Sequence, residues 1–219
     1  SVVFSPHKEG QVLATATTGE LAMVNLETSE VEIFSTLHDL ECWTGNFGEL
    51  GELSNVVYTG GDDAKLIAHD LRTQQEIWTS RRHHQAGVVS ILSPLLSWNT
   101  SNSHHLWTGS YDDHIRILDL RVIDRTAPSL IPGYVPRVLF EENLGGGVWR
   151  LIPEKLNNLN RVLVCCMYDG ARIAEPEGDK VTVEKYFKGD HESMCYGGDW
   201  IGEEAVTCSF YDNVVQVWR

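Results

Sequence analysis

A strand–turn–strand pattern recurs along this chain and constrains its fold more than any other feature. In its clearest copy, Trp107–Arg121, a short β segment ends in small residues, the chain turns at Tyr111-Asp112-Asp113, and alternating apolar residues resume at Ile115. Aspartate favours such turns because its side chain hydrogen-bonds the backbone two residues further on. A single hairpin cannot bury both of its faces. The chain is therefore expected to pack several copies side by side.

Five copies of the pattern can be recognised, and four of them carry a marker aspartate in the turn. These are Asp62, Asp112, Asp169 and Asp212, at separations of 43 to 57 residues. Four short strands in a repeat of about 40 to 45 residues are typical of WD-type propellers, with any excess length in loops. The sequence therefore predicts an all-β, WD-repeat-type β-propeller with about five blades. A β-sandwich is the alternative fold.

The 219 residues are expected to form a single β-propeller domain, residues 1–219, that is incomplete at its N-terminal end. The chain begins at Ser1 in the middle of a repeat and does not begin with Met. A propeller normally closes its ring, because an open ring leaves edge strands exposed. We therefore expect a fragment of a seven-bladed ring that lacks about two blades.

The composition argues against several classes of function. A net charge of −14 with only 17 Lys and Arg argues against nucleic-acid binding and favours a cationic partner. The five cysteines include no C-x-x-C pair, so neither a disulfide framework nor a metal site is predicted. A reducing, cytoplasmic compartment fits them best. No apolar run is long enough to cross a membrane.

Six segments, taken together and in order, carry a resemblance to a known family. They are His38–Trp43, Gly60–Asp63, Arg81–Ile91, Gly109–Asp112, Gly146–Arg150 and Cys195–Trp200. Together they resemble the WD-repeat diphthine methylesterase family of diphthamide biosynthesis. The resemblance implies a carboxylic ester hydrolase, without a cofactor, that demethylates methylated diphthine on translation elongation factor two. His69 stands where the family has a structural tryptophan.

The candidate catalytic residues are His83, Asp199 and Ser90. No G-x-S-x-G motif is present, so ester hydrolysis would need another nucleophile or an activated water. His83 is the predicted general base because imidazole titrates near neutral pH, and a structural hydrogen bond is the alternative for it and for His84. Asp199 could orient that histidine, hold a cationic substrate, or be a structural residue of its blade. Ser90 is a candidate nucleophile, with packing as the alternative.

Three tryptophans, Trp43, Trp149 and Trp200, occupy what reads as one position in three copies, near the expected axis. Together with Glu41 and Arg150 they are the predicted substrate-binding residues. The substrate that the resemblance implies carries a quaternary ammonium, which an aromatic face attracts by roughly 0.5 to 2 kcal/mol. Core packing or channel lining is the alternative role of these tryptophans.

A non-enzymatic WD-repeat scaffold that binds protein partners is the competing hypothesis, because a propeller fold does not by itself imply chemistry. The two hypotheses differ in one observable, which is whether the methylated substrate loses its methyl group.

Overall fold

Five antiparallel sheets of three or four strands dominate the computed structural model, which describes residues 1–121, 123–124, 129–155 and 160–219. We call the sheets blades 1 to 5. Blade 1 contains β1 (Val2–Phe4), β2 (Gln11–Thr15), β3 (Leu21–Asn25) and β4 (Val31–Ile33), and blade 2 contains β5 (Cys42–Phe47), β6 (Val56–Gly61), β7 (Leu66–Asp70) and β8 (Gln75–Ser80). Blade 3 contains β9 (Val88–Leu92), β10 (His105–Ser110), β11 (His114–Asp119) and β14 (Arg137–Asn143). Blade 4 contains β15 (Val148–Pro153), β16 (Val162–Cys166), β17 (Ala171–Glu177) and β18 (Lys180–Phe187), and blade 5 contains β19 (Cys195–Ile201), β20 (Glu204–Ser209) and β21 (Val215–Trp218).

The remaining elements are short and lie between the blade strands. A small pair of strands, β12 (Ile123–Asp124) and β13 (Ser129–Leu130), precedes β14. Two 3-10 helices, η1 (Gly51–Asn55) and η2 (Thr100–Asn102), complete the described elements. Within the described ranges no helix is long and apolar enough to cross a membrane.

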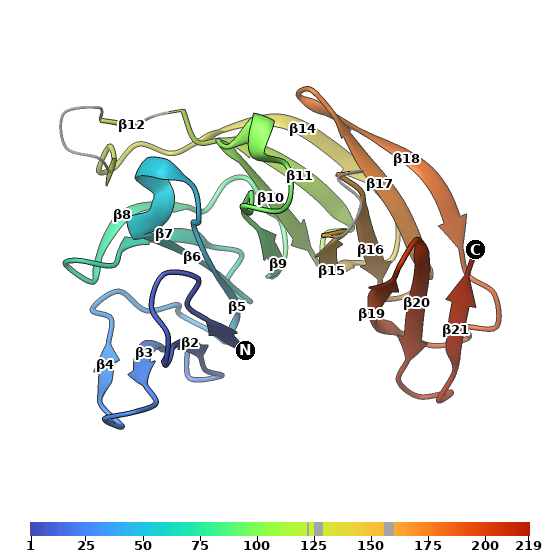
Figure 1. Cartoon of the computed structure of the whole chain (residues 1–219), viewed down its shortest axis with the longest axis horizontal. Coiled ribbons are helices and arrows are strands. Elements are labelled where there is room, and N and C mark those ends of the chain that lie inside the picture. The colour runs from blue at the N-terminus through green and yellow to red at the C-terminus, as the bar shows by residue number, and fades with distance from the viewer. Residues whose placement is uncertain (122, 125–128, 156–159) are drawn as a thin grey trace.

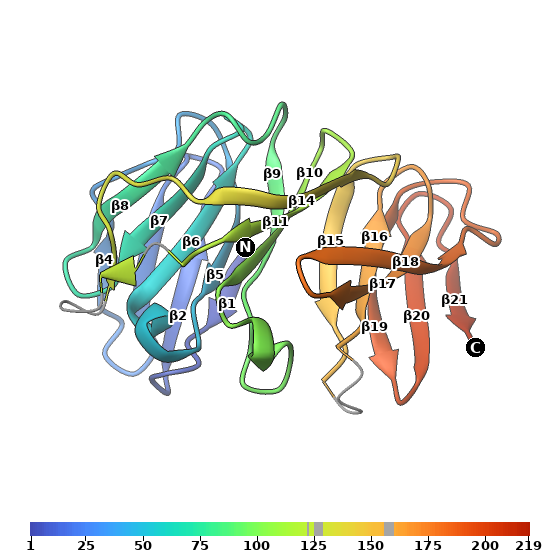
Figure 2. The ribbon, with the colours of Figure 1, turned by 90° about the horizontal axis from the view of Figure 1, so that it is seen from above.

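The blades stand side by side along an arc, with the first strand of each on the inner side (Figure 1). First strands of neighbouring blades contact one another, as β5 does with β9, β9 with β15 and β15 with β19. The second strand of one blade also contacts the first strand of the next, as Figure 2 shows for β16 and β19. This radial arrangement of separate sheets confirms the predicted propeller fold and excludes the sandwich. The single domain and the number of blades in the complete ring stay predictions.

Apolar side chains fill the space between each pair of neighbouring blades. Trp78 and Tyr58 are buried between blades 2 and 3, and Trp98 packs edge-on against Trp107 between blades 3 and 4, with ring centroids 5.6 Å apart. Every residue of β16 is buried, because both of its faces meet a neighbouring blade. A strand covered on both faces must be apolar throughout rather than alternating, which explains the apolar run Val162–Cys166.

Two glycines set the distance between blades. A Cβ on Gly60 in β6 would lie 2.6 Å from a methyl carbon of Val88 in the next blade, and a Cβ on Gly109 in β10 would lie 2.6 Å from Val148. Real Cβ atoms do not approach other atoms so closely, so only glycine fits at these positions. The absence of a side chain at these glycines therefore leaves room for a valine of the first strand of the next blade.

A chain of polar side chains ties the loop that leads into blade 2 to the sheet itself. Both ring nitrogens of His38 form hydrogen bonds, Nδ1 with Asp63 Oδ1 at 2.8 Å and Nε2 with Thr59 Oγ1 at 3.0 Å. Thr59 Oγ1 also lies 2.9 Å from Nε2 of His69. His69 thus stands in the tryptophan position and keeps its hydrogen bond to the threonine. Burial lowers the pKa of His69 to about 3, so the ring is neutral.

Blades 3 and 5 repeat parts of this arrangement. In blade 5, Thr207 Oγ1 lies 2.7 Å from Nε2 of His191 and accepts a hydrogen bond of 2.8 Å from Nε1 of Trp218. In blade 3, His84 Nε2 lies 2.9 Å from Thr108 Oγ1, and burial lowers the pKa of His84 to about 3. The structural interpretation of His84 is therefore confirmed.

The turn aspartates of these blades act on the backbone of the preceding loops. Asp63 accepts from the amide of Asp39, Asp112 from that of Gln85, and Asp212 from that of Glu192, at 2.8 to 2.9 Å. Each carboxylate thereby fixes the loop in which the blade histidine lies. The predicted turn role of Asp112 and Asp212 is confirmed, and in blade 2 Asp63 has this role instead of the marker Asp62.

Candidate functional site

The first strands of blades 2 to 5 each contain a β-bulge at the same place. The pairing register skips Trp43 in β5, Val89 in β9, Trp149 in β15 and Tyr196 in β19. A bulge inserts one residue into a strand and re-aims its side chain, and bulges are common next to functional sites. These four residues are therefore equivalent positions. They lie together at the end of the arc's inner side where the turns between second and third strands are found.

Six residues at this end form what we call the turn-face cluster. They are Trp43, Asp62, Tyr111, Trp149, Arg150 and Tyr196. Trp149 is central to it, with its ring stacked on Tyr111 at a centroid distance of 5.8 Å and 5.7 Å from the ring of Tyr196. The ring of Trp43 meets that of Trp149 edge-on at 6.4 Å. Trp149 is buried and Tyr196 is exposed, so solvent reaches the cluster from one side.

The cluster contains one negatively charged and one positively charged side chain. Asp62 Oδ1 accepts a hydrogen bond of 3.0 Å from Nε1 of Trp43. The Arg150 guanidinium lies over the Trp149 ring, 4.4 Å from its centroid, and 5.9 Å from the centroid of Tyr196. Its only hydrogen bond among the described residues is donated to the carbonyl oxygen of Trp149 at 3.1 Å. The cluster therefore offers a carboxylate and a guanidinium beside several aromatic faces.

Burial and charge act together on the ionisable groups of the cluster. The pKa of Tyr111 is raised to about 12, mainly by burial and further by the nearby Asp62 carboxylate. Burial also lowers the pKa of Arg150, although a guanidinium remains charged at any physiological pH. Tyr111 is thus a neutral phenol and Arg150 a partly desolvated cation.

Four of the predicted substrate-binding residues come together here. Trp43, Trp149 and Arg150 are members of the cluster, and Glu41 is attached to it because its carbonyl oxygen accepts a hydrogen bond of 2.8 Å from the amide of Asp62. Glu41 and Trp43 lie more than 100 positions from Trp149 and Arg150 in the chain, and only the radial packing of the blades brings the two pairs together. Their role in binding substrate stays a prediction.

The expectation that Trp200 joins Trp43 and Trp149 is wrong. Trp200 packs between blades 4 and 5, where its Nε1 donates a hydrogen bond of 3.0 Å to the carbonyl oxygen of Ile152 and its ring lies under the Arg161 guanidinium. The residue of blade 5 equivalent to Trp149 is Tyr196, four residues earlier, or about 13 Å along an extended strand. The sequence pattern did not reveal this four-residue difference in position.

Asp199 lies beside Trp200 and away from the cluster. Its side chain is exposed, accepts a hydrogen bond of 2.8 Å from the amide of Trp200, and lines a shallow hollow with Leu151 and Lys155. His83 is far from this position: its Nδ1 lies 3.0 Å from Ser80 Oγ, and its charged neighbours include Arg116 and Glu141 of blade 3. The structure therefore does not bring His83 and Asp199 together as an acid–base pair.

Ser90 is buried in β9 between blades 3 and 4. Its Oγ accepts a hydrogen bond of 3.1 Å from the backbone amide of Leu151. No histidine or carboxylate hydrogen-bonds this hydroxyl in the described part of the chain, so nothing there would activate it as a nucleophile. Likewise, the described residues include no group of three His, Cys, Asp or Glu side chains placed to hold a metal ion.

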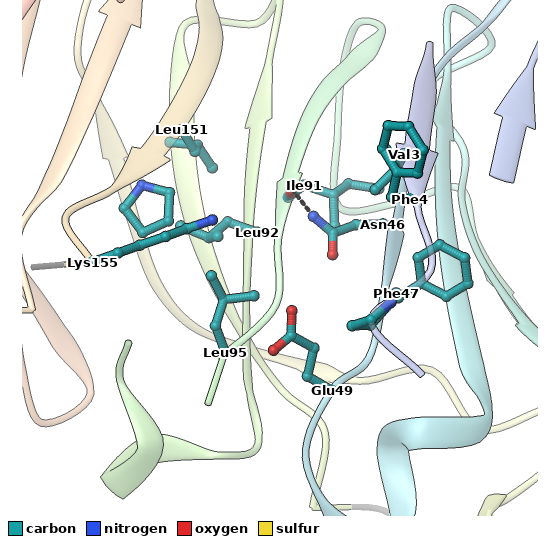
Figure 3. A pocket seen from close by; sticks show the side chains of 12 residues that line it. Val3, Phe4, Asn46, Phe47, Glu49, Ile91, Leu92, Leu95, Leu151 and Lys155 are labelled. Carbon is teal, nitrogen blue, oxygen red and sulfur yellow. Dashed lines mark hydrogen bonds between the residues drawn. The ribbon is translucent and has the colours of Figure 1, made fainter. Parts of the chain in front are cut away.

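A separate hollow of about 270 Å³ opens at the other end of the inner strands. Figure 3 shows its lining residues, which include the apolar Leu92 and Leu151 and the charged Glu49 and Lys155, located just after β5 and β15. Asn46 at its wall donates a hydrogen bond of 3.0 Å to the carbonyl oxygen of Ile91. The hollow that Asp199 and Trp200 line shares Leu151 and Lys155 with it. The predicted site residues are thus divided between two ends of the inner strands.

Three members of the cluster were absent from the sequence prediction: Asp62, Tyr111 and Tyr196. Asp62 and Tyr111 each precede the turn aspartate of their blade, and the same position is tyrosine in Tyr168 and Tyr211. Blade 2 has an acid at the position where blades 3, 4 and 5 have tyrosine, a difference that was visible in the sequence and marks Asp62 as unusual.

Comparison with curated proteins decides the family. The chain is 38% identical over 98% of its length to a protein of Saccharomyces cerevisiae named diphthine methyltransferase, and 35% identical over 96% of its length to the Schizosaccharomyces pombe protein of the same name. The chain belongs to the diphthine methyltransferase family. It spans 66% and 61% of these two family members, and 39% of the human member, to which it is 28% identical. No protein-family model matches the chain.

A solved structure supports the fold of this family member. The whole chain superposes on 60% of a chain in the crystal structure of a mitotic checkpoint complex, with a TM-score of 0.75 and 14% identity. At that identity the likeness concerns the propeller fold alone.

Proposed function

We propose that this chain is part of an enzyme that hydrolyses the methyl ester of methylated diphthine on translation elongation factor two. The similarity over 98% of the chain to a protein named diphthine methyltransferase carries the proposal. The turn-face cluster supports it, because it combines aromatic faces with a cation and a carboxylate near the axis of the propeller. No observation in the structure specifically favours a scaffold without enzymatic activity.

In the proposed reaction, water adds to the ester carbonyl carbon and the bond from that carbon to the methoxy oxygen breaks. Methanol leaves with one of the protons of the water, and a carboxylate remains on the substrate. The intermediate carries negative charge on the former carbonyl oxygen, which hydrogen-bond donors or cations must stabilise. We propose that Arg150 supplies this stabilisation. It is a partly buried guanidinium that makes no ion pair among the described residues.

The cellular setting follows from the same proposal. The five cysteines are all free thiols, four of them buried, which suits a reducing compartment. Together with a translation factor as the protein substrate, this favours the cytoplasm. The factor would present its modified histidine to the turn face, where the cluster is open to solvent on one side.

The test is to incubate the full-length protein with elongation factor that carries methylated diphthine, in water labelled with heavy oxygen. We expect methanol release and one labelled oxygen in the new carboxylate, both detected by mass spectrometry. Transfer of the methyl group to an acceptor other than water would leave the carboxylate unlabelled and would contradict hydrolysis. An unchanged ester would contradict the activity altogether.

A matched pair of variants then tests Arg150. Loss of one oxyanion-stabilising group typically lowers kcat by about a hundredfold, and we expect a loss of that order for Arg150→Gln. Arg81→Gln removes the same charge from an exposed side chain outside the cluster and should leave kcat within about twofold. Equal kcat values for the two variants would exclude Arg150 from the reaction.

A further inference from the structure

We call the hollow of about 270 Å³ at the other end of the inner strands the far hollow. Its walls come from four blades, because β1, β5, β9 and β15, or the residues just after them, all contribute side chains. Nine of its twelve lining residues are apolar, among them Phe47, Leu92 and Leu151. Pockets that enclose a whole small molecule measure about 300 to 1,000 Å³, so the far hollow suits one or two side chains of a peptide.

Three polar side chains reach the far hollow and are only partly used by the protein (Figure 3). Asn46 donates through Nδ2 to the carbonyl oxygen of Ile91, and its Oδ1 accepts no hydrogen bond from the described residues. Glu49 accepts a hydrogen bond of 3.1 Å from the amide of Leu96 but forms no ion pair in the same part of the chain. Lys155 forms neither a hydrogen bond nor an ion pair there. A few open polar groups beside apolar side chains are the usual composition of a binding site.

The amide of Asn46 is not required by the repeat. Asn46 is the third residue after the bulge residue of its strand, and the equivalent residues of blades 3 and 4 are Leu92 and Ile152. In blade 5 the equivalent residue is Asp199. Two of these four copies have an apolar side chain at the position, so the fold of a blade accepts one. The amide in blade 2 therefore calls for a reason other than folding.

The two charged residues of the far hollow stand on different blades. Glu49 follows β5 of blade 2 and Lys155 follows β15 of blade 4, and blade 3 supplies Leu92 and Leu95 between them (Figure 3). The two charges do not form an ion pair with each other. A ligand that crosses from blade 2 to blade 4 would thus meet a carboxylate, an apolar surface and an ammonium group in that order.

The surroundings of the far hollow favour a protein segment as the ligand. Leu96 at its rim is 77% exposed and Phe4 on blade 1 is 71% exposed, and exposed apolar surface beside polar groups marks a protein interaction site. The neighbouring hollow shares Leu151 and Lys155, so the depression is elongated across the blades. The net charge of −14 disfavours polyanions such as nucleic acids and anionic lipid surfaces.

We propose that the far hollow binds an extended segment of a partner protein in which a large apolar residue is flanked by a basic residue on one side and an acidic residue on the other. The apolar side chain packs between Leu92 and Leu151. The basic side chain lies beside Glu49 and the acidic one beside Lys155, while Asn46 Oδ1 accepts a hydrogen bond from the backbone of the segment. The site goes beyond the proposed reaction, because a partner bound here leaves the turn face open to the elongation factor.

Four blocked heptapeptides with the same fluorescent label test each part of the site. Two carry all three features in opposite orders, Gly-Ser-Lys-Leu-Glu-Ser-Gly and Gly-Ser-Glu-Leu-Lys-Ser-Gly. The third has only the apolar residue, Gly-Ser-Ser-Leu-Ser-Ser-Gly, and the fourth only the charges, Gly-Ser-Lys-Ser-Glu-Ser-Gly. Binding to the full-length protein is measured by fluorescence anisotropy. We expect one of the first two peptides to bind about tenfold more tightly than the third and the fourth.

Exchange of the two charges is the decisive variant. Glu49→Lys should weaken the preferred peptide by about tenfold and leave the apolar peptide unchanged. Whichever charge order the unaltered protein prefers, the double variant Glu49→Lys with Lys155→Glu should prefer the other order. Asn46→Leu introduces the residue type of blade 3 and should weaken all leucine peptides by about fivefold, because one hydrogen bond is lost.

Controls with the same changes in charge are Glu142→Lys and Lys185→Glu, both at exposed side chains outside the far hollow, and they should bind all four peptides as the unaltered protein does. An unchanged charge order in the double variant would overturn the proposal, as would the absence of any binding to the unaltered protein. A dimer in sedimentation that Leu96→Ser converts to a monomer would make a second copy of the chain the occupant and would also overturn it.

Discussion

Thr59 lies at the centre of the polar chain of blade 2, and its replacement by valine removes one hydroxyl with little change in shape. The side chain is fully buried, and its Oγ1 lies 3.0 Å from Nε2 of His38 and 2.9 Å from Nε2 of His69. Valine fills the same volume but can neither donate nor accept. Two ring nitrogens would then lose a partner in the protein interior.

The cost follows from the burial of both partners. A buried polar group left without a hydrogen bond costs about 1 to 3 kcal/mol, so the loss of both partners in Thr59→Val should lower the free energy of unfolding by about 2 to 6 kcal/mol. With a urea m-value of about 3 kcal/mol per molar, the midpoint should fall by about 0.7 to 2 M. Equilibrium unfolding of the full-length protein in urea, followed by tryptophan fluorescence, measures this shift.

Thr108 in blade 3 provides the matched comparison. It is equally buried, but its hydroxyl has one ring partner, Nε2 of His84 at 2.9 Å. Thr108→Val should therefore cost about half as much, about 1 to 3 kcal/mol. If Thr59→Val were no more destabilising than Thr108→Val, the number of hydrogen bonds would not set the cost and the reasoning would fail.

Three further predictions concern pH, blade spacing and the site. His69 and His84 bind a proton below about pH 6.5 in the unfolded state but only near pH 3 in the folded state. Between these pH values the unfolded state binds more protons, so the free energy of unfolding decreases as the pH is lowered. Urea titrations from pH 6.5 to 4.5 should show a loss of about 1.4 kcal/mol per pH unit for each histidine. Gly109→Ala places a Cβ against the next blade and should cost about 1 to 3 kcal/mol, measured in the same way. His83→Ala and Asp199→Asn lie outside the turn-face cluster and should keep kcat/KM for the methylated factor within about threefold.

Each of these has an outcome that contradicts it. Stability that stays constant from pH 6.5 to 4.5 would mean that the buried histidines are not neutral in the folded state. Gly197→Ala is the control for blade spacing, because its Cβ would meet only Cys208 Sγ at 3.7 Å, and it should be nearly neutral. A hundredfold loss of activity in His83→Ala would place catalysis away from the cluster and restore the prediction made from the sequence.

Much of the fold was predictable because an aspartate marks the turn between the second and third strands of each of four copies. Asp63, Asp112 and Asp212 each recur before an apolar strand, and each fixes the preceding loop by accepting a backbone hydrogen bond. The spacing of the marker aspartates Asp62, Asp112, Asp169 and Asp212 therefore predicted the hairpins, although the aspartate that fixes the loop of blade 2 is Asp63. The role of His69 in place of a tryptophan was also accessible, since the position is defined by the repeat.

The site was predictable only in part, because its geometry depends on bulges. A sequence shows that Trp43 and Trp149 begin equivalent strands, but it does not show that each is the extra residue of a bulge. Trp200 was taken for the third member because it is a tryptophan in a first strand, whereas the bulge in blade 5 falls at Tyr196. Trp200 lies four residues beyond that bulge, about 13 Å along the strand, and therefore cannot join the cluster.

The sequence by itself determined the family, the propeller fold and the residue types available for chemistry, because these follow from local patterns that each copy repeats. The tertiary structure alone decided which side chains share a site. Asp62 and Arg150 are separated by 88 positions in the chain, and only the radial packing of blades 2 to 4 brings both to Tyr111 and the tryptophan pair. Local patterns fix strands, but the meeting of distant strands depends on packing and register, which no single segment encodes.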